Sequence, residues 1–395
     1  MAGITALGTT YTLPNYTGLL FGLTPADTPF FSAIGGLTGG RQTTDTEFEW
    51  GTYDLRSAGQ NVALEGQTAP TPQERVRGTA KNVLQIHQEA VAVSYTKQAA
   101  TARLGGLASQ GTANSVLNEL DWQTRVMLVQ MVRDINWSFI NGTYQLPVDN
   151  TTARKTRGLL AAITSNVTSV AGAGTAGTAA AATDIITATA HGLVANDTIR
   201  FNSVGAATGI NTTTVYYVSA TNLAANTFSV SLTKGGAVVD ITADGTTNWN
   251  KGAALTKANI DTTLQLAYDN GGLTNGGATL LVGSAQKLAI TTAYTAAGYV
   301  LKSLDANLGG VNVTRIDSDF GELSIMLDRA MPQDTIAVVS MDQCAPVFLE
   351  VPGKGHFFEE PLAKTGASDQ NQLYGETGLA YGNQLTHAKI TGLKA

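Results

Sequence analysis

The sequence predicts an α+β protein with an N-terminal arm, a long β-hairpin, one long helix, a mixed α/β body and a separate small all-β module. Three observations predict this class. Apolar and polar residues alternate in the two limbs of segment 47–95, as they do in β-strands. Apolar residues recur three and four positions apart over 112–141, as in an amphipathic helix. Short β-type runs separated by turn residues fill 167–250.

Residues 1–45 are expected to form an extended arm. Pro14, Pro25 and Pro29 interrupt any helix in this segment before it can grow. Two apolar clusters, Leu19-Leu20-Phe21 and Phe30-Phe31, are too hydrophobic for a disordered tail. We therefore expect the arm to dock, either on the body of its own chain or on a neighbouring copy.

Residues 46–96 are expected to form a long hairpin. Phe48, Trp50 and Leu55 mark the outgoing limb, and the alternating residues of 83–95 mark the return. The tip, Ser57–Glu74, contains glycines and prolines and is too open to bury both faces of the ribbon. Because an isolated hairpin is marginal in water, this one requires a partner surface.

The two limbs of the hairpin carry opposite charges. Acidic residues lie on the outgoing limb and basic residues on the return limb: Asp45, Glu47, Glu49 and Asp54 against Arg75, Arg77 and Lys81. Such charges would fix the register of the ribbon or the orientation of a partner more than they would add affinity. Solvated strand faces explain the same pattern equally well.

The remaining body alternates helices and strands. Thr112 can cap the long helix, and Asn141-Gly142 can end it. Beyond residue 256 the pattern predicts helices at 257–270 and 284–294, strands at 279–282, 311–316, 324–327 and 336–340, and a returning hairpin over 373–393.

Residues 167–255 differ from the flanking segments in charge and in sequence pattern. Segment 167–250 has only Arg200 and Lys234 as cations, and it opens with the linker-like run Ala171–Ala182. Five β-type runs follow, at 184–190, 197–202, 214–220, 227–232 and 237–242. We expect an all-β module inserted at a loop tip of another domain, where an insertion disturbs little packing.

Composition favours a protein covered by copies of itself. Charged residues make up only 14% of the 395 residues, against roughly 25% in an ordinary soluble chain, and hydrophobic residues make up 43%. A charge-poor monomer is the alternative. The net charge of −6 and the lack of basic clusters disfavour sequence-specific nucleic-acid binding and leave only weak, non-specific contact with nucleic acid. The sequence shows no signal peptide and no membrane span.

No motif predicts catalysis, a cofactor or a metal. Gly172-Ala-Gly174-Thr-Ala-Gly177 matches a dinucleotide fingerprint, but β-type residues follow it where a helix is required. Cys344 and His356 lack an oxyanion-type turn, so we interpret the cysteine as a packing residue. The four histidines have no metal-ligand spacing. The acidic pairs Asp317/Asp319 and Glu359/Glu360 are expected to be solvated at turns.

In order and texture, these elements resemble the major capsid proteins of tailed bacteriophages of the Hong Kong 97 type. The stretch from Thr46-Glu-Phe-Glu-Trp50 through Glu65-Gly66 to Ser94-Tyr95-Thr96 resembles the extended loop of actinophage-type members, and 112–141 resembles their spine helix. The resemblance implies six parts: an N-terminal arm (1–45), an extended loop (46–96), a peripheral domain (97–150), an axial domain (151–166 and 256–340), an inserted β module (167–255) and a C-terminal return (341–395).

The resemblance further implies a structural protein that assembles as hexamers and pentamers into an icosahedral shell around phage double-stranded DNA. Assembly would occur in the host bacterial cytoplasm, with scaffold, portal and decoration proteins as further partners. Some members join subunits through a lysine in the extended loop, but this chain has no lysine before Lys81, so we expect no such cross-link. A phage tail or decoration protein and an encapsulin-like shell protein are the alternatives. The expected inter-subunit contacts are Phe30, Phe31, Trp50, Tyr53, Arg56, Arg75 and Arg77.

Overall fold

The computed structural model describes residues 26–97, 119–273, 278–297, 315–364 and 366–395. They form two units. The smaller takes its described residues from residue 26, 87–133 and 357–375, and the larger from 27–86, 134–356 and 376–395. The expected cluster Leu19-Leu20-Phe21 and the expected cap Thr112 lie outside the described residues.

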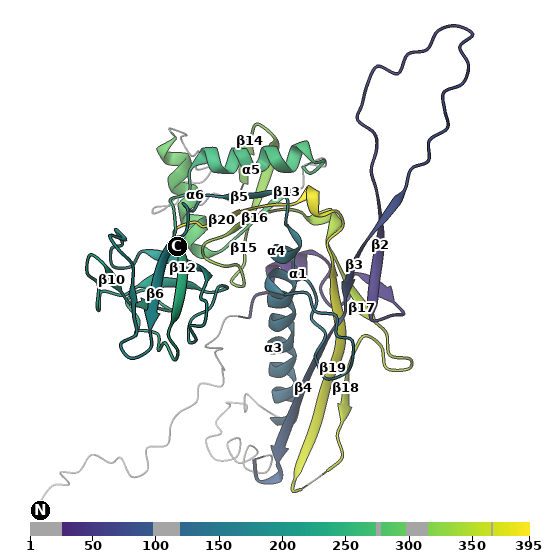
Figure 1. The fold of residues 1–395 in the computed structure, drawn as a ribbon. Coiled ribbons are helices and arrows are strands. Elements are labelled where there is room, and N and C mark those ends of the chain that lie inside the picture. The colour runs from purple at the N-terminus through teal and green to yellow at the C-terminus, as the bar shows by residue number, and fades with distance from the viewer. Residues whose placement is uncertain (1–25, 98–118, 274–277, 298–314, 365) are drawn as a thin grey trace, which may run out of the picture. The chain divides into compact units, whose positions relative to one another are not determined.

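The larger unit contains the sheet that corresponds to the predicted mixed body. Its strands lie in the order β14-β15-β13-β16-β20-β5, and α5 and α6 pack against it (Figure 1). All residues of β13 and β16 are buried, as expected for strands covered on both faces. The bounds are β5 Val167–Ser169, α5 Lys257–Asp269, β13 Ala278–Val282, α6 Ser284–Ala296, β14 Arg315–Ser318, β15 Gly321–Leu327, β16 Ile336–Ser340 and β20 Ala388–Thr391.

These bounds confirm the two predicted helices and the strands predicted at 279–282, 324–327 and 336–340. Of the strand predicted at 311–316, residues 311–314 lie outside the described residues, and β14 begins at Arg315. Thr256 caps α5 as a polar N-cap residue should, because its hydroxyl accepts from the backbone N–H of Asn259. The returning hairpin expected over 373–393 is wrong. Its two strands, β19 and β20, belong to different sheets, because the 3₁₀ turn Gln384–Thr386 redirects the chain between them.

The predicted β module is also present in the larger unit. Its strands lie in the order β10-β7-β6-β12-β8-β9-β11 around a core of their own, in which Phe228 contacts Trp249 edge to face. The bounds are β6 Thr175–Ala180, β7 Ile185–Thr187, β8 Thr198–Ser203, β9 Val215–Val218, β10 Thr227–Phe228, β11 Val230–Ser231 and β12 Gly245–Lys251.

Four details of the module differ from expectation. The run Ala171–Ala182 is not a linker, because β6 lies within it and pairs on both sides, with β7 and β12. Tertiary pairing overrides the weak strand propensity of its alanines and glycines. Strand β12 was not expected, and residues 237–242 form an isolated bridge instead of a strand. Strand β5 pairs with β20, so the module begins after Ser169.

The expected ribbon is present but shorter than predicted. Strand β2 (Glu47–Tyr53) pairs in antiparallel register with β3 (Arg77–Val83). The chain then leaves the ribbon at Leu84, which is fully buried, and continues as β4 (Gln85–Ser94). The expected return limb 83–95 is therefore wrong, because β4 pairs with β19 and not with β2.

The smaller unit contains most of β4, β18 (Phe357–Pro361) and the first part of β19 (Ser368–Ala380), which lie side by side (Figure 1). Glu359 and Glu360 are part of β18 and not of a turn. His87 on β4 is buried, and burial lowers its pKa to about 4.

The long helix α3 (Glu119–Asn141) begins in the smaller unit and ends in the larger. Met131, Ile135 and Phe139 are buried along one stripe, as the spacing predicts, and the helix ends at Asn141 as expected. Residues 112–118 lie outside the described part of the chain. Two further short helices are α1 (Pro29–Ala33) and α4 (Leu159–Ala162).

Within the described residues, the arm is not simply extended. Pro29 begins α1 where it was expected to prevent a helix, because proline is tolerated in the first turn. Further along, β1 (Arg41–Thr43) runs parallel to β17 (Ala345–Leu349), which in turn pairs with the last residues of β19. Both short elements tie the arm to the body of the same chain.

Candidate inter-subunit surface

The projecting ribbon is anchored at its base by Asn82. This side chain is completely buried and makes four hydrogen bonds. Its amide group donates to the carbonyls of Arg157 at 3.1 Å and Leu379 at 2.7 Å, and its oxygen accepts from the backbone N–H groups of Arg157 at 2.8 Å and Val83 at 2.9 Å. Since these partners come from separate segments, Asn82 fixes the direction in which the ribbon leaves the body.

Aromatic residues of β2 reinforce this base. Phe48 is buried, and a Cβ on Gly378 would come within 2.6 Å of its ring, so β19 needs a glycine where the ring lies against it. The indole nitrogen of Trp50 donates to the carbonyl of Gly382 at 2.7 Å, and its ring meets that of Tyr381 edge to face at 4.9 Å. Trp50 is thus half-buried against its own chain, which differs from the expectation that it contacts a neighbour.

One of the expected charge pairs links the two limbs. Lys81 lies 2.6 Å from Glu47, and this hydrogen bond raises the pKa of the lysine. Arg77 lies opposite Tyr53 in the register, so no acidic residue faces it across the ribbon. The opposite charges therefore set the register at the base of the ribbon but are not matched toward its tip.

Beyond the ribbon, residues 54–76 form an open loop (Figure 1). Five apolar side chains of the loop and its margins have between 73% and 85% of their surface exposed: Tyr53, Leu55, Val62, Leu64 and Val76. Isolated exposed apolar residues are ordinary, but five in one projecting segment indicate a surface that another molecule covers.

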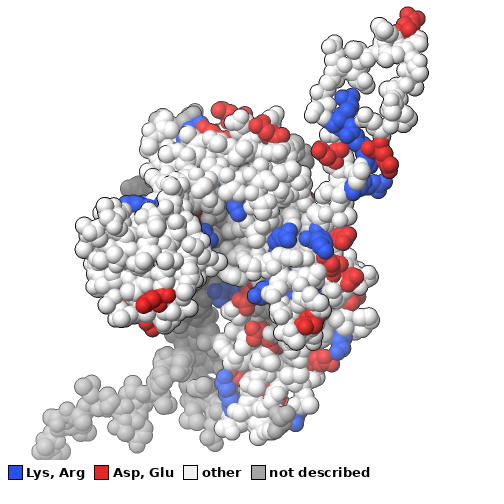
Figure 2. All heavy atoms as spheres, in the orientation of Figure 1, with Lys and Arg blue, Asp and Glu red and all other residues white. Residues whose placement is uncertain are grey.

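The charged side chains of this segment gather where the loop meets the ribbon, while most of the loop surface is uncharged (Figure 2). Arg56, Arg75 and Arg77 are exposed, and none forms an ion pair with any residue that the structure describes. Tyr53, Arg56, Arg75 and Arg77 are therefore available to a partner. Sequence reasoning missed Val62, Leu64 and Val76, whose signal was an apolar residue within a segment of turn-forming residues.

Phe30 and Phe31 are not available to a partner. Both are buried within their own chain, where Phe31 meets Phe139 of α3 edge to face at 5.6 Å. The Asn136 side chain accepts from the N–H of Phe31 at 2.9 Å, and Asp328 accepts from that of Phe30 at 3.2 Å. These contacts correct the expectation that the two rings bind a neighbouring copy: they hold the arm to its own body.

The residues considered for catalysis do not form a site. Burial raises the pKa of the Cys344 thiol to about 12, so it is protonated and unreactive at neutral pH. The glycine fingerprint runs into β6 with no helix after it. Within the described ranges, no cluster of three or more histidine, cysteine or acidic residues could hold a metal ion. No described helix is long and apolar enough to cross a membrane.

The described loop and its margins thus present uncovered apolar and cationic side chains, as a surface that binds another subunit would. The sequence matches the SU10 major capsid protein family over residues 3–394. The chain belongs to this family. It is accordingly a phage major capsid protein, a component of the virion shell and not an enzyme.

Solved structures are similar to this chain over nearly its whole length. The capsid asymmetric unit of cyanophage A-1(L) is 13% identical, with a TM-score of 0.53 over 97% of this chain and 98% of that chain. The capsid of cyanophage P-SCSP1u is 10% identical, with a TM-score of 0.49 over 98% and 94% of the two chains. A Synechococcus elongatus encapsulin complex is 9% identical, with a TM-score of 0.48 over 96% and 93%.

The fold assignment depends on the first of these, whose TM-score exceeds 0.5. It identifies the fold as the Hong Kong 97-type capsid fold with mixed α and β content, as the element order predicted. No curated protein matches this sequence.

Proposed function

We propose that this capsid protein assembles as hexamers and pentamers into an icosahedral shell around phage double-stranded DNA, and that loop 54–76 holds each subunit to a neighbour. The exposure of Tyr53, Leu55, Val62, Leu64 and Val76 is the observation that carries this proposal. These side chains contribute no burial to their own fold, so their hydrophobic character is useful only in an assembly.

The burial available to the loop is large enough to matter. Covering one large apolar side chain stabilises an interface by about 1.5–3 kcal/mol, so five would contribute on the order of 7–15 kcal/mol before the costs of association. Arg56 and Arg75 of the loop and Arg77 at the start of β3 would select orientation, since exposed charges steer docking more than they add affinity. Assembly should therefore persist in moderate salt, with its rate reduced by screening.

Loop variants test the proposal directly. We expect the double variant Leu55→Ser, Leu64→Ser to fold but to remain as unassembled subunits by sedimentation and negative-stain microscopy. The matched control Val194→Ser, Leu232→Ser changes two residues of the β module that are also more than half exposed, and it should form closed particles. Normal closed shells from the loop variant would refute the role of the loop, and deletion of Ser57–Glu74 provides a second, more severe test.

We also propose that the shell is not covalently cross-linked through the loop. Residues 1–80 contain no lysine, so the tip has no side-chain amine to form an isopeptide bond. Virions boiled in SDS should yield the single chain on a gel, and a ladder of covalent multimers would contradict this.

We also propose the division into arm, extended loop, peripheral domain, axial domain and inserted module that the resemblance implies. We narrow the inserted module from 167–255 to about 172–251. Both ends of the module meet the C-terminal strand region: a Cβ on Gly392 would lie 2.5 Å from Ala171, and Ala253 forms a bridge with Leu393. Such close ends allow excision. We propose that the module lies on the outer face of the shell, where it obstructs neither lattice closure nor DNA.

Replacing 172–251 by a short glycine-serine linker should preserve particles of normal diameter and reduce only their outer density. Loss of closed particles while the truncated chain remains folded would contradict a peripheral module. Nuclease-protected DNA inside purified particles would distinguish a DNA shell from one that packages protein.

A further inference from the structure

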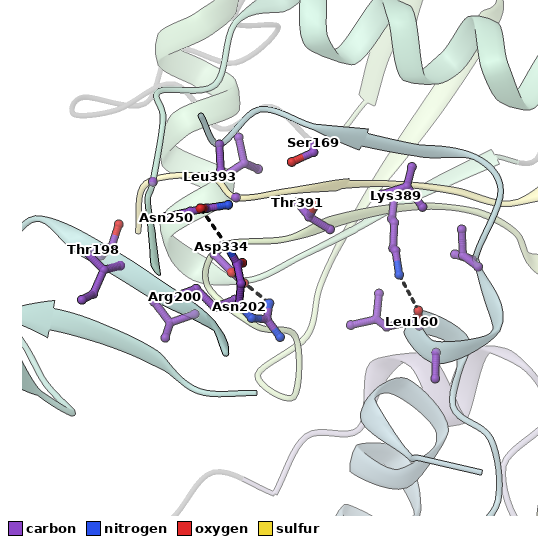
Figure 3. Close-up of a pocket in the computed structure, with 18 of the residues that line it drawn as sticks. Leu160, Ser169, Thr198, Arg200, Asn202, Asn250, Asp334, Lys389, Thr391 and Leu393 are labelled. Carbon is purple, nitrogen blue, oxygen red and sulfur yellow. Dashed lines mark hydrogen bonds and ion pairs between the residues drawn. The ribbon is translucent and has the colours of Figure 1, made fainter. Parts of the chain in front are cut away.

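A cleft of about 470 Å³ lies where the β module meets the sheet of the larger unit (Figure 3). Its walls come from β8, β9 and β12 of the module and from β5, β20 and the segment before β5. Its volume is in the range of small-molecule sites. Three of its lining residues are charged: Arg200 on β8, Lys389 on β20 and Asp334 just before β16.

Arg200 is fixed but retains donor capacity. Its guanidinium pairs with Asp334 at 3.0 Å and donates to the carbonyls of Thr212 at 3.1 Å and Thr213 at 3.3 Å. These bonds use three of the five N–H groups of an arginine, one from each of its nitrogens. One N–H on each terminal nitrogen has no acceptor in residues 119–273 or elsewhere in the described chain. Asp334 also accepts from the hydroxyl of Thr335.

Lys389 has no anionic partner in the part of the chain that the structure describes. Its ammonium donates to the carbonyl of Leu160 at 2.8 Å, and no carboxylate of the described residues lies within ion-pair distance. Burial and the positive charge of Arg200 lower the pKa of Lys389, which shows that the two cations act on each other. A partly buried ammonium with one neutral acceptor is costly, and two of its three N–H donors remain for a ligand.

We propose that this cleft binds a small oxyanion of the phosphate class between Lys389 and Arg200. Four donors without a protein acceptor, carried by two cations against one carboxylate, match an anion with several acceptor oxygens. Hydroxyls of Ser169, Thr198 and Thr391 line the same cleft and can supply further hydrogen bonds (Figure 3). Because Lys389 and Arg200 belong to different sheets, the bound anion fastens the β module to the body.

Calorimetric titration of the full-length chain with inorganic phosphate, at constant ionic strength and pH, tests this site. Wild type and the control Lys234→Met, which removes a lysine from a module turn, should bind equally. Lys389→Met should bind at least about tenfold more weakly, as expected for loss of a charge-assisted hydrogen bond, while Lys389→Arg should retain binding. Equal affinity of Lys389→Met and wild type, or no binding by wild type, would overturn the proposal.

A second measurement on wild type remains informative if Lys389→Met fails to fold. At a phosphate concentration about ten times Kd, acylation of Lys389 measured by peptide mass spectrometry should be about tenfold slower, with Lys234 unchanged. Repeating the experiment with a deoxynucleoside monophosphate distinguishes free phosphate from a phosphate carried by a nucleotide. Protection of Lys389 by neither ligand would exclude the site.

Discussion

Asn82 holds the ribbon in place, and the substitution Asn82→Ala tests this anchoring. The side chain is fully buried; three of its four hydrogen bonds connect the ribbon to Arg157 and Leu379, and the fourth is accepted from Val83 of the same strand. At about 1 kcal/mol per net hydrogen bond, their loss should lower the free energy of unfolding by about 4 kcal/mol. The cost is high because the backbone partners stay buried without water.

Urea unfolding of the unassembled chain measures this effect through the midpoint and slope of the transition. The matched control is Asn202→Ala, whose side chain donates to Asn248 and Asn250 at 2.9 and 2.8 Å on the exposed surface of the module. There, water can replace both partners, so we expect a loss below about 1 kcal/mol.

Assembly gives a second readout for Asn82→Ala. At a temperature where the variant remains folded, closed particles should be fewer, because the ribbon leaves the body in a less defined direction. A change in unfolding free energy equal to that of Asn202→Ala would refute the anchoring role, even if assembly were impaired.

Three further predictions follow from buried groups. The pKa of His87 is about 4 in the folded chain against 6.5 in the unfolded one, so the unfolded state binds more protons between these two pH values. The contribution of neutral His87 to the free energy of unfolding is fully present above pH 6.5 and should fall by up to about 3 kcal/mol as the pH decreases to 4. His87→Leu should remove this loss from the pH profile of urea unfolding. Burial raises the pKa of the Cys344 thiol from 9.0 to about 12, which leaves about a thousandfold less thiolate at pH 8. A thiol-specific colorimetric reagent should therefore react with Cys344 only on unfolding, and rapid labelling of the native chain would contradict its burial. Trp50→Phe keeps a ring against Tyr381 but loses the bond to Gly382, which should cost about 1 kcal/mol by thermal unfolding, against about 3 kcal/mol for Trp50→Ala. A cost near zero for Trp50→Phe would show that the indole hydrogen bond has no separate role.

Most of the fold could be predicted from the sequence because local pattern and burial agree. Over 257–269 the spacing of Ile260, Leu264 and Ala267 specifies a helix with one buried stripe, and the cap Thr256 marks where it begins. The run 336–340 is apolar throughout and forms a strand buried on both faces.

The errors arose where long-range pairing decides the structure. Segment 83–95 has the alternation of a strand, but alternation does not identify the partner, and β4 pairs with β19 instead of β2. In β6, alanine, glycine and threonine have no marked pattern, and the strand exists because β7 and β12 supply hydrogen bonds on both sides. Strands β12 and β19 lie more than fifty positions away from β6 and β4, which they pair with, and a local pattern does not reveal such partners.

At the candidate inter-subunit surface, too, the local sequence does not identify the partner of a hydrophobic segment. In the sequence, the pair Phe30-Phe31 looks like Leu55 and Leu64: all are apolar residues in segments that lack a core of their own. Because the hydrophobic effect is non-directional, the sequence indicates that they need to be covered but not which chain covers them. The structure separates them. The phenylalanines come with Asn136 and Asp328, which accept the backbone N–H groups that burial would otherwise leave unsatisfied, and so they dock within their own chain. The loop leucines stay exposed even though Gln67 accepts the N–H of Leu64, so their own chain does not cover them, and we propose that another copy supplies their burial.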